Sequence, residues 1–194
     1  NARKDYESIL PVKNNSFFYP SVATSLLLSE MIDMKGAKID FLKIRGGWSQ
    51  VGSTGALAPY NIIPTFGLTN TGFGNQGFLP NTQFNPELKA ETVTGIEFGL
   101  DAKLFSNRLR LSATYYDQQS EDLLVPIQVS SSTGYTNSWD NIADMSNKGI
   151  EIQLGGTIVR SDDFSFDVDV NFAKNENEVV SLGELDSYVL GGQW

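Results

Sequence analysis

Residues 94–104 read Thr-Gly-Ile-Glu-Phe-Gly-Leu-Asp-Ala-Lys-Leu. Every second residue from Thr94 to Leu104 is apolar or small enough to face lipid, whereas the residues between them are glycine or charged. Successive side chains of a β-strand point to opposite faces, so this segment would have one apolar face and one polar face. The pattern therefore predicts a strand that separates an apolar medium from an aqueous one.

The same alternation recurs in later segments, so it predicts a sheet rather than a single strand. It resumes at residues 109–116 after a break at Ser106-Asn107, and it returns at 150–158 and 164–172, on either side of Ser161-Asp162-Asp163. Short polar breaks of this kind suit tight turns. Long hairpins with one apolar and one polar face are typical of transmembrane β-barrels, which is our first interpretation of the chain.

The composition excludes several classes of function. The 194 residues include neither cysteine nor histidine, which removes disulfides, thiolate metal sites and the commonest general base. The formal net charge is −9 and no basic patch stands out, so we expect no nucleic-acid partner. No apolar run reaches the about 18 residues of a transmembrane helix. The start, Asn1-Ala2-Arg3-Lys4-Asp5, is not a secretion signal and indicates the interior of a larger protein.

The expected strands have connections of very unequal length. Tight turns fall at one end, and long loops over residues 52–90, 119–146 and from 176 onward fall at the other. Outer-membrane barrels have this polarity, with short periplasmic turns and long extracellular loops. The connection between Ser29 and Asp40 is intermediate and has room for one helical turn. We expect strands near residues 17–28, 41–51, 92–105, 108–118, 147–160 and 164–175.

Aromatic residues gather near both ends of these expected strands. One set lies beside the short turns, and the other lies about eight residues further along, which is on the order of 20 Å in tilted strands. This spacing approaches the roughly 25 Å apolar band between the two aromatic girdles of a membrane barrel, although aromatic residues also favour soluble sheets. The two sets are Phe41, Phe105 and Phe164, and Trp48, Tyr115, Tyr116 and Phe172.

About six strands are too few to close a membrane barrel, since single-chain barrels begin at about eight. The chain is therefore expected to be either part of the wall of a larger barrel or a soluble sheet protein. Charges on the polar face favour the wall, because an unpaired charge that faces a dry core is costly. The charged side chains expected to face inward are Glu97, Asp101, Lys103, Arg110, Glu151, Asp167 and Asp169.

Several short segments occur in a characteristic order along the chain. They are Arg3-Lys4-Asp5-Tyr6-Glu7-Ser8, Asn14-Asn15-Ser16-Phe17-Phe18-Tyr19-Pro20, Phe41-Leu42-Lys43-Ile44-Arg45-Gly46-Gly47-Trp48, Asn85-Pro86-Glu87-Leu88-Lys89-Ala90-Glu91-Thr92, Glu97-Phe98-Gly99-Leu100-Asp101, Asn107-Arg108-Leu109 with Thr114-Tyr115-Tyr116-Asp117, Asn141-Ile142-Ala143-Asp144-Met145-Ser146-Asn147-Lys148-Gly149, and Asn171-Phe172-Ala173-Lys174-Asn175-Glu176-Asn177. In order and spacing they resemble the later barrel region of the SusC/RagA-type TonB-dependent outer-membrane transporters. The resemblance covers nearly the whole chain.

The resemblance implies an all-β fold, namely an antiparallel transmembrane β-barrel wall with long extracellular loops. About six strands of a barrel of about 22 strands with a plugged lumen would lie here. It implies import of an oligomeric nutrient, a glycan or a peptide, across the outer membrane. TonB would power this import through the plug, a SusD-like surface lipoprotein would cover the barrel, and the wall would contact outer-membrane lipid. Residues 1–194 would be a partial β-barrel domain, with the signal peptide, N-terminal domain, plug and final strands outside them.

Nothing in the sequence predicts catalysis, and we expect no enzyme, no cofactor and no metal site. Asp162-Asp163 occupies an expected tight turn, where aspartate is common for backbone reasons. Asp167 and Asp169 share a strand face, but no nucleophile or pocket accompanies them. Gly72-Phe73-Gly74 lacks the strand and helix that flank a phosphate-binding loop.

Aromatic residues in the long loops are the candidates for ligand contact. Extracellular loops carry recognition, and aromatic faces stack on sugars or peptides. Packing of the loop onto itself and contact with a partner protein are the open alternatives. The loop aromatics are Tyr60, Phe66, Phe73, Phe78, Tyr135 and Trp139, of which Tyr60, Phe66, Tyr135 and Trp139 are the predicted substrate or partner contacts.

Two other classes of function are open at the level of the sequence. A soluble all-β carbohydrate-binding or adhesion module is the main alternative, whereas a β-sandwich glycan hydrolase lacks a convincing pair of carboxylates. Exposure separates these classes, because one apolar belt would be open in a barrel wall and covered by a second sheet in a sandwich. The diagnostic side chains are Ile96, Phe98, Leu100, Leu109, Leu111, Ile150, Ile152, Phe166 and Val168.

Overall fold

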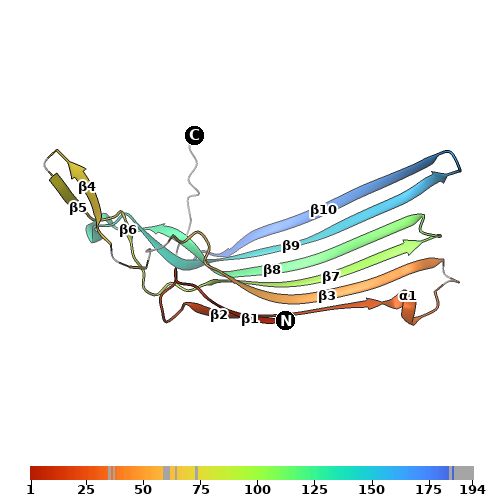
Figure 1. The fold of residues 1–194 in the computed structure, drawn as a ribbon, viewed down its shortest axis with the longest axis horizontal. Coiled ribbons are helices and arrows are strands. Elements are labelled where there is room, and N and C mark those ends of the chain that lie inside the picture. The colour runs from red at the N-terminus through yellow and green to blue at the C-terminus, as the bar shows by residue number, and fades with distance from the viewer. Residues whose placement is uncertain are drawn as a thin grey trace.

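The computed structural model describes residues 1–34, 36, 38–58, 62–63, 65–72, 74–183 and 185. Its main feature is one long antiparallel sheet (Figure 1) with the strand order β1-β2-β3-β7-β8-β9-β10. These strands are β1 (Ala2–Tyr6), β2 (Ser16–Leu27), β3 (Ile39–Ser53), β7 (Glu91–Leu104), β8 (Leu109–Gln128), β9 (Asn137–Arg160) and β10 (Ser165–Ser181). The fold is therefore all-β, as predicted, and the described strands form an open wall and not a closed barrel.

The smaller elements lie at the two ends of the sheet. A hairpin of β4 (Gly67–Thr71) and β5 (Gly74–Phe78) stands apart from it, and β6 (Thr82–Gln83) pairs with β9 in parallel. A 3-10 turn, η2 (Ser131–Thr133), follows β8, and α1 (Leu28–Met31) supplies the helical turn expected after β2. No helix among the described residues is long and apolar enough to cross a bilayer.

The two ends of the sheet differ as predicted (Figure 1). The turn end carries α1 and the short β7–β8 and β9–β10 connections, whereas the loop end carries β4, β5 and β6. In the β7–β8 turn, Phe105, Ser106 and Asn107 all have φ near +60°, which lets the chain reverse within a few residues. The backbone amide of Asn107 also donates to Asp40 Oδ2 at 2.9 Å and thereby ties this turn to β3.

Three strands are longer than the alternation predicted, since β10 also runs to Ser181 and occupies the first part of the loop expected from residue 176 onward. β8 continues to Gln128 and β9 already begins at Asn137, so the loop expected over residues 119–146 shrinks to 129–136. The register of this pair shifts between Ser120 and Leu124, where Asp122 adopts a φ of +59°. A bulge breaks the two-residue period, which is why the sequence pattern stops there although pairing continues. The prediction of a long loop was wrong for most of this segment.

The register brings the apolar side chains of adjacent strands onto one face. Leu100 lies between Ile44 and Ala113, and Leu154 lies between Leu111 and Val170. We call this set the apolar belt. Its members are Val22, Leu26, Leu42, Ile44, Trp48, Ile96, Phe98, Leu100, Ala102, Leu104, Leu109, Leu111, Ala113, Tyr115, Ile150, Ile152, Leu154, Ile158, Phe166, Val168, Val170 and Phe172.

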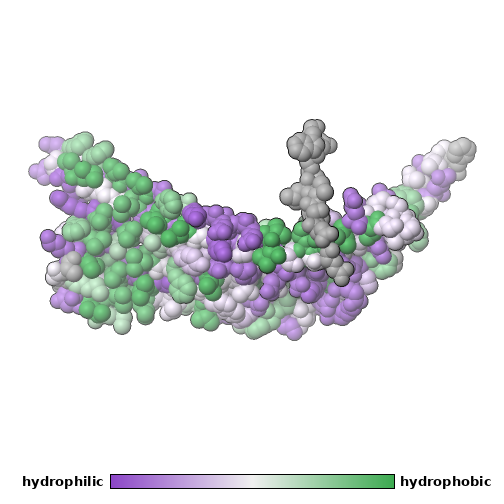
Figure 2. All heavy atoms as spheres, turned by 180° about the vertical axis from the view of Figure 1, so that it is seen from behind, coloured by the Kyte–Doolittle hydropathy of each residue, from purple (hydrophilic) through white to green (hydrophobic). Residues whose placement is uncertain are grey.

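The apolar belt is open rather than covered. Figure 2 shows apolar atoms gathered over the half of the sheet nearest the turn end. Phe98 is 59% exposed and Phe172 is 54% exposed, and in the described part of the chain no second sheet lies over them. An apolar surface of this extent in water would cost roughly 25 cal/mol per Å², whereas lipid accommodates it. This finding favours the barrel wall over the soluble sandwich.

The loop-side edge of the belt is sharp. On the same face, Tyr115 is followed by Asp117 along β8, and Ile150 is preceded by Lys148 along β9. Trp48 lies at the same edge, opposite Ile96. Two residues predicted for the aromatic girdles do not belong there. Phe41 and Tyr116 have the opposite parity in their strands and therefore lie on the polar face.

A small core lies at the loop end, where the strands extend beyond the belt. It contains Leu10, Leu57, Leu88 and Leu124, and Leu88 is fully buried. Phe17 and Trp139 are among the half-buried residues that pack against it. We call this group the loop-base cluster, because it joins the β1–β2 connection and the loop before β7 to the upper part of the sheet.

Candidate functional site

The polar face of the sheet, opposite the apolar belt, carries a network of charged side chains. Asp101 Oδ2 lies 3.6 Å from Lys43 Nζ and 3.7 Å from Arg45 Nε, and Asp101 Oδ1 accepts a hydrogen bond of 2.7 Å from Ser112. Arg45 also pairs with Glu97. These residues are half-buried or exposed, so the face is a polar surface in contact with water and not a dry core.

The structure places all the predicted inward charges on this face, because they alternate with the belt residues along β7, β8, β9 and β10. Two cations that were not predicted to face inward, Lys43 and Arg45, lie on the same face. The signal was present, since both alternate with Leu42 and Ile44 in the same two-residue period. Asp101 on β7 pairs with both of these cations, which lie on the adjacent β3.

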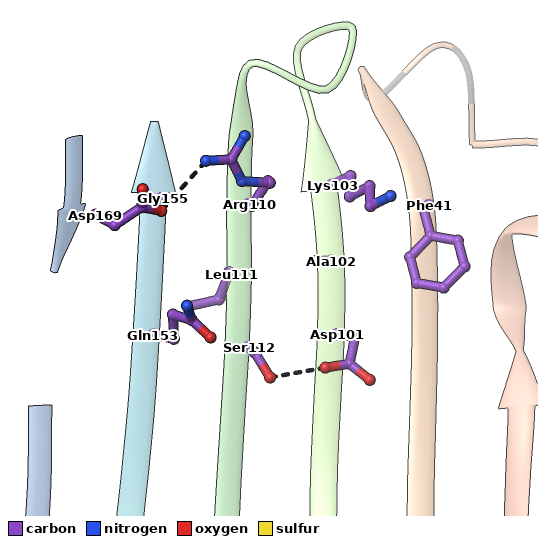
Figure 3. Close-up of a pocket in the computed structure, with 10 residues that line it drawn as sticks. All are labelled: Phe41, Asp101, Ala102, Lys103, Arg110, Leu111, Ser112, Gln153, Gly155 and Asp169. Atoms are coloured by element: carbon purple, nitrogen blue, oxygen red, sulfur yellow. Dashed lines mark hydrogen bonds and ion pairs between the residues drawn. The ribbon is translucent and has the colours of Figure 1, made fainter. Parts of the chain in front are cut away.

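A shallow hollow of about 300 Å³ lies on the polar face near the turn end (Figure 3). Lys103 and Arg110 are directly opposite each other across β7 and β8, an arrangement in which like charges repel. Each has a separate neighbour that offsets its charge. Arg110 Nη2 lies 3.2 Å from Asp169 Oδ1, and Lys103 Nζ lies 5.6 Å from the centre of the Phe41 ring. Apolar side chains such as Phe41 and Leu111 line the hollow together with these charged ones, and the lining has no arrangement that would perform chemistry.

Three groups of residues on the polar face share the same arrangement. In each, a long side chain passes over a glycine of the neighbouring strand and contacts a residue on the strand beyond it. Arg45 on β3 lies over Gly99 on β7 and donates to Thr114 Oγ1 on β8 at 2.6 Å. Arg110 crosses Gly155 to reach Asp169 in the same way. The third group is Tyr116, Gly149 and Asn175. Only glycine leaves room for these crossings, which tie strands that are not direct neighbours.

A small charged cluster lies above the belt on β1 and β2. The Tyr19 hydroxyl and the Arg3 guanidinium donate hydrogen bonds to Asp5, with Arg3 Nε 2.8 Å from Asp5 Oδ1. The hydrogen bond from Tyr19, followed by that from Arg3, holds the pKa of the Asp5 carboxyl below its ordinary value. The same bond raises the pKa of the Tyr19 phenol.

Three of the segments that carry the family resemblance meet at the loop base. The Asn141 side chain accepts from the Lys89 amide at 3.0 Å and donates to the Lys89 carbonyl at 3.0 Å and to the Asp122 carbonyl at 2.7 Å. Asn14 Nδ2 donates to the carbonyls of Glu87 and Leu88, both at 3.1 Å. Residues 85–89 are therefore clasped from two sides, although they form no strand of their own.

The predicted loop contacts fall into different environments. Phe66 is 74% exposed beside β4, and Tyr135 is half-buried after η2. Trp139 on β9 packs against the loop-base cluster, and its carbonyl accepts from Asn85 Nδ2 at 3.0 Å. Phe78 lies across Gly67 in the β4–β5 hairpin. Tyr60 and Phe73 lie outside the described residues.

No three acidic side chains within the described ranges gather closely enough to hold a metal ion. Asp162 and Asp163 lie in the exposed β9–β10 turn, away from the polar network. The geometry thus consists of an apolar outer face, a charged inner face, short turns at one end and loops at the other. This combination defines a segment of the wall of a transmembrane β-barrel.

Comparison with known proteins gives the family. The family model described as TonB dependent receptor-like, beta-barrel matches residues 2–192. The chain therefore belongs to the TonB-dependent receptor-like β-barrel family, and it is a segment of an outer-membrane β-barrel.

Curated relatives agree with this assignment and with the SusC/RagA-type resemblance. TonB-dependent receptor P3 of Formosa agariphila is 31% identical over 189 residues, which cover 95% of this chain and 19% of that protein. TonB-dependent receptor P26 of the same organism is 29% identical, with the same coverage. TonB-dependent receptor SusC of Bacteroides thetaiotaomicron is 25% identical over 185 residues, which cover 90% of this chain and 18% of SusC. The chain thus spans about a fifth of the length of these relatives.

Solved structures show the same fold. The RagAB peptide importer in the closed-closed state superposes with a TM-score of 0.88 at 25% identity, over 97% of this chain and 21% of the solved chain. The siderophore receptor PirA from Pseudomonas aeruginosa is more distant, with a TM-score of 0.53 at 17% identity over 87% of this chain and 30% of that chain, and it supports the fold alone.

Proposed function

We propose that this chain forms part of the wall and of the extracellular loops of a TonB-dependent importer. The importer would carry an oligomeric nutrient, a glycan or a peptide, across the outer membrane. The observation that carries the proposal is the match of residues 2–192 to the receptor barrel family, together with a wall that is apolar outside and charged inside. The similarity to SusC and to the RagAB peptide importer supports the choice of cargo.

The proposal includes a domain assignment and partners. Residues 1–194 would be a partial β-barrel domain of a longer receptor, whose plug contacts TonB. A SusD-like surface lipoprotein would bind at the loop end, and outer-membrane lipid would contact the apolar belt. The similarity to SusC and RagAB supports the lipoprotein partner. We further propose that the chain has no catalytic role, in line with a family of receptors.

Within the loops, we propose Tyr60, Phe66, Tyr135 and Trp139 as contacts to the cargo or to the lipoprotein. The exposure of Phe66 supports this role most directly. Trp139 also stabilises the loop base, so its replacement would change both recognition and folding. Phe66→Ala and Tyr135→Ala are therefore the variants to compare in binding measurements.

The test is an uptake measurement in the native host. The gene for the full-length receptor is deleted, TonB is deleted in a second strain, and the accumulation of labelled oligosaccharides and oligopeptides is followed. We expect one class of oligomer to fail to accumulate in both strains, and plasmid-borne receptor to restore it in the first. Unchanged uptake of every oligomer in the receptor deletion would contradict the proposal.

A further inference from the structure

The loop end of the chain carries two long segments without charge. No Asp, Glu, Lys or Arg occurs between Arg45 and Glu87 or between Asp122 and Asp140, although charged residues make up 19% of the chain. The first segment includes β4, β5 and β6, and the second includes the top of β8, η2 and the start of β9. The charge-free residues beyond the belt thus come from two different loops at the same end of the sheet (Figure 1).

Hydrogen bonds join the end of the first segment to the second segment. The Asn81 carbonyl accepts from the amide of Thr136 at 2.8 Å and from that of Asn137 at 3.2 Å. Directly after Asn81, β6 pairs with β9 through Thr82 and Asn137. We call the described residues 65–72, 74–83 and 129–139 the neutral loop surface.

The neutral loop surface presents aromatic rings together with uncharged polar groups. Phe66 is 74% exposed and Phe78 is 51% exposed. Amide and hydroxyl side chains can both donate and accept hydrogen bonds, as sugar hydroxyls do. The exposed polar side chains of this surface are Thr69, Asn70, Asn75, Gln76, Asn81, Ser131 and Ser132.

The charged residues that end the two segments at the loop base, Glu87, Asp122 and Asp140, are engaged within the protein, and Asp140 Oδ1 accepts the Asn141 amide at 2.9 Å. Lys13 pairs with Glu87, and Lys89 Nζ lies 2.8 Å from Asp122 Oδ2. Glu91 Oε1 accepts the Leu124 amide at 2.9 Å. An anionic polymer would find no cation on the neutral loop surface. A peptide would find no counter-charge there for its termini, which are common anchors in peptide recognition.

We propose that the neutral loop surface binds an uncharged oligosaccharide, in preference to an anionic polysaccharide or a peptide. This inference rests on the proposed function and narrows its substrate class. Ring faces supply the apolar contact for the C–H face of a sugar, and the amides and hydroxyls bind its hydroxyl groups.

The experiment uses the full-length receptor, purified with its lipoprotein, on an array of neutral oligosaccharides, uronate- or sulfate-bearing oligosaccharides and peptides. We expect binding to be confined to neutral oligosaccharides. Their affinity should change less than about twofold between about 50 and about 500 mM NaCl, because screening weakens only charged contacts. Binding of a peptide or an anionic glycan, a strong fall of affinity with salt, or no binding by the neutral class would each overturn the inference.

A pair of variants locates the binding on this surface. Phe66→Ala should weaken binding of the neutral oligosaccharide roughly fivefold, because it removes a stacking face. Phe18→Ala is the control, since Phe18 is a comparably exposed ring on β2 outside the surface, and it should leave binding unchanged. Equal affinity of both variants, or loss of the lipoprotein from the Phe66→Ala complex, would overturn the assignment.

Uptake separates this inference from the proposed function. TonB-dependent uptake restricted to peptides would leave the importer standing and would overturn only the neutral glycan. Absence of any receptor-dependent uptake would overturn the importer itself.

Discussion

Leu154 and Gln153 are neighbours on β9 whose side chains face different media. Leu154 lies midway between Ile150 and Ile158 in the apolar belt and is 42% exposed. Gln153 lies on the polar face, in register with Ser112 and Asn171. A charge at these two positions therefore meets lipid in one case and a wet, partly acidic surface in the other.

We expect Leu154→Arg to destabilise the full-length receptor by about 2–4 kcal/mol, the cost of an arginine near the bilayer midplane. Refolding into lipid vesicles followed by denaturant titration measures this cost. Gln153→Arg is the matched control and should change the free energy of unfolding little, because Glu151 and Asp169 lie nearby on the polar face. Equal effects of the two variants would mean that the faces are assigned wrongly.

Gly99 leaves the space through which Arg45 reaches Thr114. A Cβ at this position would collide with the Arg45 side chain. We expect Gly99→Ala to displace Arg45 and to cost about 1–2 kcal/mol, since Thr114 and Glu97 both lose a hydrogen-bond partner. The thermal unfolding temperature of the purified receptor reports the change. Gly47→Ala, whose Cβ would meet only the Val22 carbonyl at 3.8 Å, should be close to neutral, and an equal loss there would refute the crossing.

Side-chain parity, not proximity to a strand end, decides which aromatic residues face lipid. Trp48 and Tyr115 share the parity of the belt, whereas Phe41 and Tyr116 do not. Counting aromatics by height alone therefore placed two of them on the wrong face. The alternation could have corrected this, because Phe41 lies in phase with Lys43 and Arg45. The glycine crossings could not be predicted in this way, since they depend on the register between three strands.

The upper part of the β8–β9 hairpin and the clasp at the loop base could not be predicted from local sequence patterns. The belt strands could be predicted because lipid and water impose a strict two-residue period. Beyond the belt both faces meet water or protein, the period is relaxed, and a bulge near Asp122 interrupts it. The pairing of Asn141 with Lys89 joins residues 52 positions apart, which no local pattern encodes.

We expect Asn141→Ala to loosen residues 85–89 without unfolding the wall. The variant removes three hydrogen bonds, so amide exchange at Lys89 in the full-length receptor should accelerate at least roughly tenfold. Hydrogen–deuterium exchange with mass spectrometry measures this. Asn137→Ala is the control on the same strand, because its side chain bonds the neighbouring Thr136. Unchanged exchange at Lys89 would show that the clasp contributes nothing.

The position of the bilayer relative to the sheet follows from the edge of the apolar belt. The lipid boundary on the loop side passes between Tyr115 and Asp117 on β8 and between Ile150 and Lys148 on β9. The sequence alone predicts this boundary, because charged residues begin to occupy the apolar face at this point. Pairing across the long loops, such as that of β3 with β7, required the structure.

Spin labels test this boundary. Because the chain contains no cysteine, Tyr115→Cys and Asp117→Cys each add one labelling site to it. In the full-length receptor in lipid vesicles, we expect the label at position 115 to collide mainly with oxygen and the label at 117 mainly with a water-soluble nickel chelate. Tyr116→Cys, on the polar face, should report water. Preference of the label at 117 for oxygen would move the boundary outward and contradict the assignment.

The 24-residue β9 extends far beyond the apolar belt and holds the loop tips at a distance from the lipid. Its part above Ile150 rises about 30 Å in a tilted strand. A molecule bound at the loop tips would thus lie far from the lipid head groups. Leaflet composition should govern how firmly the receptor is anchored, whereas the protein alone should govern which molecules it captures.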